Sequence, residues 1–341
     1  MVALHGQPRS FLGINLTPSQ VSLVELIDRG KRLELVAYAS AEVPVQSGSA
    51  INSYDAATTK QLVAFLNQVF EQAALSSDAA VFSLFSPHIF STVLELPDVP
   101  DQELTHAIYY KARDLVPADL NDMVITATRP NEHKHHVPWQ QPEPASVVLS
   151  PASSTPAPTP TMKMATTNTR YLIHAIPLQT IIWYRELARA LHLELIALEE
   201  NIFPISRIHP VTNSHSTFFV HVDNDMVNLY AASSGTISLT RTIDFNSRSL
   251  HPAILTEEIE RTLARHVQAG FPAPSQVYLL GRGANLSALQ QLLSSSLLCP
   301  VNISQPFSGL TYPQGIEQSL TAQGPGFTVA VGLAERQMNI L

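Results

Sequence analysis

The amino-acid sequence predicts an α/β protein of two lobes, with a small subdomain inserted into the first lobe. The chain has 341 residues, more than one ordinary hydrophobic core accommodates. Segments with strand-like and helix-like patterns alternate along it. The front of the chain has the order strand-strand-strand-helix-strand-helix, and this order returns in weaker form near residue 216. Two such units that face each other leave a cleft, where we expect a ligand or partner site.

The first lobe is predicted to have its core over residues 11–86, completed by about 193–215 and 326–341. Apolar residues alternate in its strand segments, and Leu62 and Leu66 are spaced as on one face of a helix. Its first elements are expected to be three strands, a helix and a buried strand, at 11–16, 21–27, 33–39, 55–74 and 79–85. Its later elements are expected to be a strand and two helices, at 193–198, from Asn201, and at 327–338.

The inserted subdomain is predicted over residues 87–192. Its strands and helices are expected at 90–96, 100–115, 123–128, 171–176 and 180–191. Pro117 ends the first of these helices, because proline cannot donate a backbone hydrogen bond. The segment 130–168 is rich in Pro, Ser, Thr and Ala, and has too little apolar surface to offset the entropy lost on ordering. We interpret it as a disordered surface loop.

The second lobe is predicted over residues 216–325. It is expected to open with three strands that form a meander, at 218–222, 227–231 and 236–242. A helix, a strand and a second helix should follow, at 255–269, 277–280 and 286–297. Because this order resembles the front of the chain, the two lobes are expected to be structural duplicates.

Composition and charge exclude several classes of protein. The net charge is -8 and the isoelectric point is about 5.9, which argues against a general nucleic-acid role because phosphate binding needs a basic surface. No segment has the roughly 18 consecutive apolar residues of a membrane helix, and no apolar signal core follows the first charges. We therefore expect a cytoplasmic protein with no membrane span of its own. One cysteine, Cys299, excludes an internal disulfide and a cysteine-based zinc site.

Several short motifs, taken in order, resemble the PilM family of actin-like proteins of type IV pilus assembly. The two opening motifs, Phe11–Leu16 and Val21–Leu26, are similar to the family's first hairpin. The motifs that follow are Leu96-Pro97, Glu103-Leu104, Leu115–Pro117, Glu258–Leu263, Leu280–Ala284, Pro306-Phe307 and Ala330–Ala334. Together they span nearly the whole chain except the Pro-rich segment. The MSHA-pilus counterpart MshI and the cytoplasmic domain of the secretion protein GspL share this architecture, so the particular system stays open.

The resemblance implies an actin-like fold, in which two lobes of the ribonuclease H type are duplicated. It implies a cytoplasmic scaffold of a pilus inner-membrane platform, held at the membrane by a partner. That partner is a PilN-like single-span membrane protein, whose short tail lies between the first lobe and the inserted subdomain. We expect Leu96, Tyr109, Leu115 and Pro117 to line this groove. Other platform proteins or assembly ATPases are further expected partners.

The resemblance also places a nucleotide site between the lobes, and this chain departs from the required residues. In the first hairpin Asn15 stands for an Asp, Thr17 for a Gly and Ser22 for a Lys. In the second hairpin His221 stands for the Asp and Asp223 for the Gly. An amide cannot act as a base, and a carboxylate beside the phosphates would repel them. These departures predict a site unable to hydrolyse ATP.

The turn expected on the adenosine side keeps Gly281 and Gly283, with Arg282 between them. Glu200, Glu258 and Arg261 match positions near the family's nucleoside pocket, although a solvent-exposed role suits each equally well. We therefore expect a vestigial cleft with no catalytic residue, no metal and no cofactor. The alternatives are an ATP-binding actin-like ATPase that uses magnesium, or a GspL-like secretion component.

A cluster of three histidines, His133, His135 and His136, lies in the Pro-rich segment. Imidazole side chains bind transition metals, but this segment is expected to be a flexible polar loop with no ordered carboxylate nearby. We therefore interpret the cluster as part of the loop.

Limited proteolysis should cut the chain first within residues 130–168, because a segment of this composition leaves its backbone open to a protease. The check is mass spectrometry of early tryptic and proteinase K fragments. An early fragment pattern that spares this segment would show that it is ordered.

Overall fold

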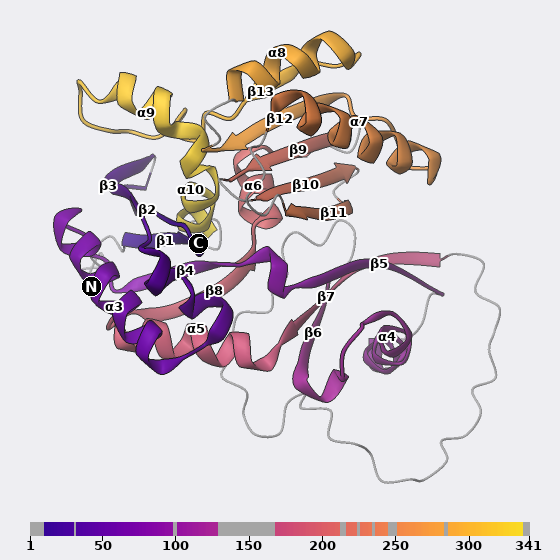
Figure 1. Ribbon diagram of the computed structural model, residues 1–341, viewed down its shortest axis with the longest axis horizontal. Helices are drawn as coiled ribbons and strands as arrows, with labels where there is room; N and C mark the ends of the chain where they lie inside the picture. The colour runs from indigo at the N-terminus through magenta and orange to yellow at the C-terminus, as the bar shows by residue number, and fades with distance from the viewer. Residues whose placement is uncertain are drawn as a thin grey trace, which may run out of the picture.

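The computed structural model contains three β-sheets, two of five strands and one of three, and the two larger sheets lie in separate lobes (Figure 1). The structure describes residues 10–30, 32–97, 101–128, 168–211, 216–223, 226–233, 236–244, 251–282 and 286–336. Within these ranges, no helix is both long enough and apolar enough to cross a membrane. The Pro-rich segment and its histidines lie outside the described residues, apart from Asn168.

The first sheet has the strand order β3-β2-β1-β4-β8. Its strands are β1 (Ser10–Leu16), β2 (Gln20–Asp28), β3 (Leu33–Glu42), β4 (Ala79–Leu84) and β8 (Glu194–Glu200). β1 pairs antiparallel with β2 and parallel with β4, so it lies at the centre of the sheet. Six of the seven residues of β1 are buried, because helices cover both faces of this sheet.

One face of the first sheet is covered by α1 (Val45–Gly48), α2 (Ala50–Ser53), α3 (Ala56–Gln72) and α5 (Leu178–Ala190). Asp55 caps α3 by accepting a 2.9 Å hydrogen bond from the Thr58 backbone N–H. We predicted α5 as part of the inserted subdomain, and this was wrong. Its buried residues Trp183, Tyr184 and Leu187 pack in the core of the first sheet, because its apolar stripe faces α3 and β4.

The second sheet repeats this arrangement with the order β11-β10-β9-β12-β13. Its strands are β9 (Ser216–Val222), β10 (Met226–Ser233), β11 (Thr236–Asp244), β12 (Gln276–Gly281) and β13 (Val301–Ile303). β9 pairs antiparallel with β10 and parallel with β12, as β1 does with β2 and β4. The helices α7 (Pro252–Gln268) and α8 (Leu286–Ser296) cover its outer face (Figure 1).

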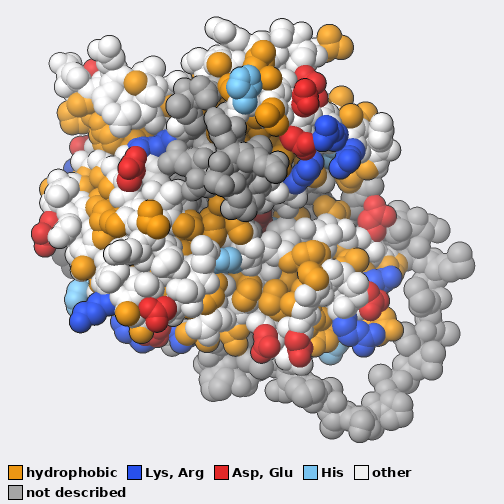
Figure 2. Space-filling model, in the orientation of Figure 1, with side chains coloured by type: hydrophobic (Ala, Val, Ile, Leu, Met, Phe, Trp, Pro, Cys, Tyr) orange, Lys and Arg blue, Asp and Glu red, His pale blue; other side chains and the backbone are white. Residues whose placement is uncertain are grey.

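The third sheet, in the order β5-β7-β6, belongs to the inserted subdomain. Its strands are β5 (Phe90–Pro97), β6 (Met123–Thr128) and β7 (Asn168–Pro177), and α4 (Asp101–Leu115) covers one face. Leu94, Leu96 and Ile108 form a small core between the sheet and α4. Short 3-10 turns, Ser86–His88 and Leu120–Asp122, lead into β5 and β6. On the viewed face, hydrophobic side chains form a band across this subdomain (Figure 2).

Two helices fill the space between the two large sheets: α6 (Ile202–Ile208) and α10 (Thr328–Ala334). A glycine lies at each of two close backbone contacts of α10, one with β1 and one with α6. A Cβ on Gly13 of β1 would lie 2.0 Å from the carbonyl oxygen of Ala330, and one on Gly332 would lie 2.2 Å from that of Pro204. Only residues without a side chain allow backbones to come so close. α10 is preceded by α9 (Glu317–Gln323) and a 3-10 turn (Gly324–Phe327), neither of which the sequence pattern predicted.

A buried carboxylate joins these central elements. Glu199, at the end of β8, is 2% exposed and accepts two hydrogen bonds from Arg207 of α6, at 2.8 and 2.9 Å. Arg336, which follows α10, approaches the same carboxylate at 3.2 Å. Losing both arginines would leave the Glu199 carboxylate buried without a positive partner, which is expensive in free energy. Burial also raises the pKa of Glu335 to about 7, although Arg207 nearby acts in the opposite direction.

Gly13→Ala should lower the free energy of unfolding by about 3 kcal/mol, because the new methyl group meets backbone atoms that cannot move aside. Urea unfolding followed by circular dichroism measures this. Gly324→Ala is the matched control, since a Cβ there meets nothing closer than 3.4 Å. Equal stability of the two variants would contradict the close approach of β1 and α10.

Glu335→Gln should make stability less dependent on pH between about 4.5 and 7. In this window folded Glu335 keeps a proton that the unfolded chain releases, so wild-type stability falls as pH rises. One such group changes the free energy of unfolding by at most about 1.4 kcal/mol per pH unit. Urea unfolding at several pH values compares the wild type with this variant and with Glu257→Gln, an exposed control. Three equal slopes would contradict the raised pKa.

Candidate functional site

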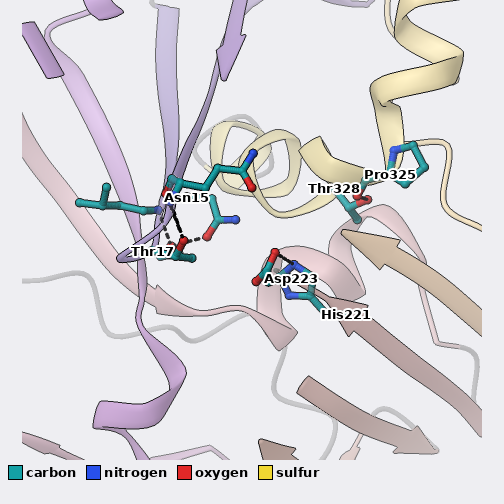
Figure 3. Close-up of polar contacts among 9 residues, drawn as sticks. Asn15, Thr17, His221, Asp223, Pro325 and Thr328 are labelled. Atoms are coloured by element: carbon teal, nitrogen blue, oxygen red, sulfur yellow. Dashed lines mark hydrogen bonds and ion pairs between the residues drawn. The ribbon is translucent and has the colours of Figure 1, made fainter. Parts of the chain in front are cut away.

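The cleft between the lobes is bordered by two hairpins, β1–β2 and β9–β10 (Figure 3). Figure 3 shows Asn15 and Thr17 on one side, and His221 and Asp223 on the other. The structure therefore brings together four of the residues that the resemblance assigned to the nucleotide site. Their contacts determine what this cleft can bind.

Asn15 is used inside its own lobe. It is 7% exposed, and its Oδ1 accepts a 2.8 Å hydrogen bond from the Ser83 hydroxyl of β4. The Leu16 backbone N–H donates to the same hydroxyl at 3.3 Å, which links β1 to β4. Ser22 lies opposite Asn15 in the β1–β2 ladder and is also buried. An amide bonded in this way supplies neither the negative charge that orients magnesium nor a base.

Thr17 closes the first hairpin on itself. Its backbone N–H donates to the Gln20 carbonyl at 2.8 Å, and its hydroxyl accepts from the Gln20 N–H at 3.1 Å. A phosphate-binding turn needs backbone N–H groups that point freely at the anion. In this hairpin the N–H groups of both Thr17 and Gln20 already have acceptors.

The second hairpin pairs a buried histidine with a partly buried aspartate. His221 Nε2 lies 3.5 Å from Asp223 Oδ1, and the Asp223 backbone N–H donates to the Met226 carbonyl at 2.9 Å. His221 Nδ1 and Asp223 Oδ2 are buried and make no hydrogen bond. A carboxylate in this position repels an approaching phosphate, because little water is present to screen the two negative charges from each other.

The turn after β12 carries Gly281 and Arg282, whereas Gly283 lies outside the described residues. Gly281 has φ +98°, and a Cβ there would lie 2.0 Å from the Val222 carbonyl oxygen. Glycine is therefore required at this turn for reasons of local geometry. The Arg282 backbone N–H donates to the same carbonyl at 3.0 Å, which fixes the start of its side chain beside β9.

A hollow of about 590 Å³ lies beside Arg282. Its lining is mainly neutral and polar, with Ser40, Ser287, Gln305, Thr321 and Gln323 contributing. No Asp or Glu lines it among the described residues. Nor do the described residues contain any group of three or more His, Cys, Asp or Glu that could hold a metal ion.

The structure does not bring Glu258 to this hollow. Glu258 lies on the outer helix α7, where Arg241 approaches it at 3.4 Å and Arg261 also binds it. Figure 2 shows acidic and basic side chains gathered beside α7. Glu258 thus belongs to a surface group of charges, the alternative that the sequence left open.

The four residues expected in the partner groove do not form one surface. Leu96 is 2% exposed and packs in the core under α4, so its expected place on an open groove was wrong. The reason is strand alternation, which turns Leu96 and Leu94 to the same covered face. Tyr109 is half-buried against Val116 and its neighbours, whereas Leu115 is 45% exposed and Pro117 is exposed.

The structure has a pocket where the inserted subdomain meets both lobes, and we refer to it as the junction pocket. Its volume is about 250 Å³. It is lined by Pro87, Ile89, Phe90, Ser91, Glu200, Tyr230, Thr240, Arg241 and Thr242. None of the four expected groove residues is among them. Only Glu200 had been noted in the sequence, for the nucleoside pocket and not for a partner.

A buried polar group supports one wall of the junction pocket. Glu200 Oε2 lies 2.7 Å from His174 Nδ1, and the Ser91 hydroxyl lies 3.0 Å from the same nitrogen. His174 comes from β7, Ser91 from β5 and Glu200 from β8, so this group ties the subdomain to the first lobe. Ser91 and His174 carried no signal in the sequence, because each is a single polar residue in an apolar strand.

A chain of a PilM-PilN type IV pilus biogenesis complex superposes on this protein with a TM-score of 0.72. The match covers 97% of this chain and 98% of that chain, at 17% sequence identity. The fold is actin-like. The actin-like fold expected from the motifs is thereby confirmed, including its duplicated sheets.

Two further solved structures are less similar. One is a Bacteroides thetaiotaomicron protein with an actin-like ATPase fold and unknown function, with a TM-score of 0.48, 12% identity, and 94% and 98% coverage of this chain and that chain. The other is the cytoplasmic domain of EpsL, an inner-membrane component of the type II secretion system of Vibrio cholerae, with a TM-score of 0.45, 11% identity, and 92% and 93% coverage. Neither a protein-family model nor a curated protein matches the sequence significantly.

Proposed function

We propose that this protein is a cytoplasmic scaffold of a pilus inner-membrane assembly platform, and that it binds the short tail of a PilN-like membrane protein. The observation that carries the proposal is the likeness to a chain of the PilM-PilN complex, which extends over nearly the full length of both chains. The protein would then be held at the inner membrane by its partner. The proposal applies to type IV pili and to MSHA pili alike.

The junction pocket is our candidate for the tail. It lies where the inserted subdomain meets both lobes, and Ile89 and Phe90 give it an apolar wall beside polar Thr240 and Glu200. At about 250 Å³ it is smaller than the roughly 300–1,000 Å³ typical of small-molecule sites. A pocket of this size suits an anchor side chain of a peptide, with backbone groups of the peptide bonded along the rim.

We further propose that the interlobe cleft does not hydrolyse ATP. Asn15 is bonded within its lobe, and the N–H groups of Thr17 and Gln20 in the first hairpin have acceptors. Asp223 adds negative charge where phosphates would lie, and Arg282 extends across the cleft to Ser40. An actin-like ATPase is the rival function, and it requires a carboxylate and free backbone N–H groups at these hairpins.

Purified protein should show no magnesium-dependent ATP hydrolysis above a buffer blank, because it has no carboxylate at position 15 to orient magnesium and water. Phosphate release measured with and without MgATP tests this. Hydrolysis that disappears in Asn15→Ala or His221→Ala would contradict the proposal and favour the ATPase.

Thr240→Trp should weaken binding of the tail at least tenfold, because the indole would fill the junction pocket. The tail is first identified by a pull-down from detergent-solubilised membranes. The proposal requires a single-span protein with a short cytoplasmic N-terminus. Fluorescence anisotropy then measures binding of the synthetic tail peptide.

Thr105→Trp is the matched control, since Thr105 is exposed on α4 away from the junction pocket. The affinity of Thr105→Trp for the tail peptide should stay near that of the wild type. The melting temperatures of both variants should also stay near the wild-type value. If Tyr109→Ala weakens binding of the tail peptide at least tenfold while Thr240→Trp does not, the tail binds along α4 instead. A pull-down without any such membrane protein would contradict the scaffold proposal itself.

A further inference from the structure

Arg282 extends from one lobe to the other. Its backbone lies at the end of β12 in the second lobe, and its guanidinium reaches β2 and β3 of the first. Nη2 donates a hydrogen bond to the Ser40 hydroxyl. With the Gln20 amide turned so that its oxygen faces the guanidinium, Nη1 and Nε donate to that oxygen at 2.7 and 2.6 Å.

Other groups hold the same guanidinium from the sides. It lies 5.5 Å from the centre of the Phe327 ring, an attractive arrangement for a cation over an aromatic face. A Cβ on Gly326 would lie 2.5 Å from Arg282 Cγ, so the side chain passes closely over this backbone. Partial burial lowers the pKa of Arg282, while the carboxylates of Asp223 and Glu42 favour its charged form. Arginine stays protonated in such surroundings.

These contacts come from three separate parts of the molecule. Gln20 and Ser40 belong to the first lobe, Asp223 belongs to the second, and Phe327 precedes the helix α10 that packs between them. The nucleotide site that the sequence resemblance implies would lie between the same two lobes. In this chain a side chain of the protein itself makes contacts on both sides of the cleft.

We propose that Arg282 is a built-in clasp that holds the two lobes in the relative position seen in this structure without any nucleotide. Its charge is opposed to that of Asp223, and its donors are satisfied by Gln20 and Ser40, so this arrangement needs no bound anion. The lobes then keep one relative position whatever the nucleotide concentration. This inference concerns the cleft alone and does not depend on the proposed partner.

A distance measurement across the cleft tests the clasp. Cys299 is the single cysteine, so Cys299→Ser gives a background for two spin labels. Lys60 on α3 and Gln291 on α8 are exposed and lie on opposite lobes, so labels at cysteines placed there report the opening of the cleft (Figure 1). Double electron–electron resonance then gives the distance distribution, with and without MgATP or sodium pyrophosphate.

The clasp predicts one narrow distribution in the labelled protein, unchanged by either anion. Arg282→Ala should broaden the distribution and shift it to longer distances. Arg261→Ala, which removes an arginine bonded only within the second lobe among the described contacts, should leave it unchanged. The double substitution Gln20→Ala with Ser40→Ala removes the acceptors from the other side and should reproduce the broadening, even if Arg282→Ala folds poorly.

Two results would overturn the clasp. One is a folded Arg282→Ala or Gln20→Ala/Ser40→Ala protein whose distribution matches the wild type in width and centre. The other is a wild-type distance distribution that shifts when MgATP or pyrophosphate is added. Anion binding, and not Arg282 alone, would then set the relative position of the lobes. Circular dichroism establishes that each variant is folded.

Discussion

The packing of α10 against β1 is the contact on which the rest of the architecture depends. Gly13 and Gly332 allow backbone to meet backbone on two sides of this short helix. Because α10 also contacts α6, it supports the first sheet and the second at once. The two hairpins are thereby brought to face each other, and the position of the cleft follows. A side chain at either glycine would push the sheets apart before it affected any binding residue.

Three polar contacts lie where parts of the molecule meet. Glu199 joins β8 to α6, His174 and Glu200 join the subdomain to the first lobe, and Arg282 joins the two lobes. Buried charges of this kind add little net stability, because desolvation cancels much of their attraction. They do favour one arrangement over others, since displaced partners would be left unpaired. Such an arrangement suits a protein whose surfaces must keep a constant shape.

Strong periodicity made the larger elements predictable, and the residues that the motifs singled out, Asn15, Thr17 and Asp223, lie on the two hairpins that face each other. The misses have physical causes. β13 and α9 are too short to establish a period, and α5 resembles any amphipathic helix until its partner surface is known. The junction pocket collects neutral residues such as Thr240 from distant segments. Neither this pocket nor the contact of Arg282 with the first lobe can be recognised from a local sequence pattern, because both form only when the lobes come together.

The contact between Gly13 and Ala330 also has a consequence during synthesis. More than three hundred residues separate the two in sequence, so β1 leaves the ribosome long before α10 exists. Until then the apolar surface of the first sheet that α10 will cover stays open to water. Non-local contacts of this kind form slowly and expose nascent chains to aggregation. The first lobe therefore begins to fold early and is completed late, and apolar surface stays exposed in between.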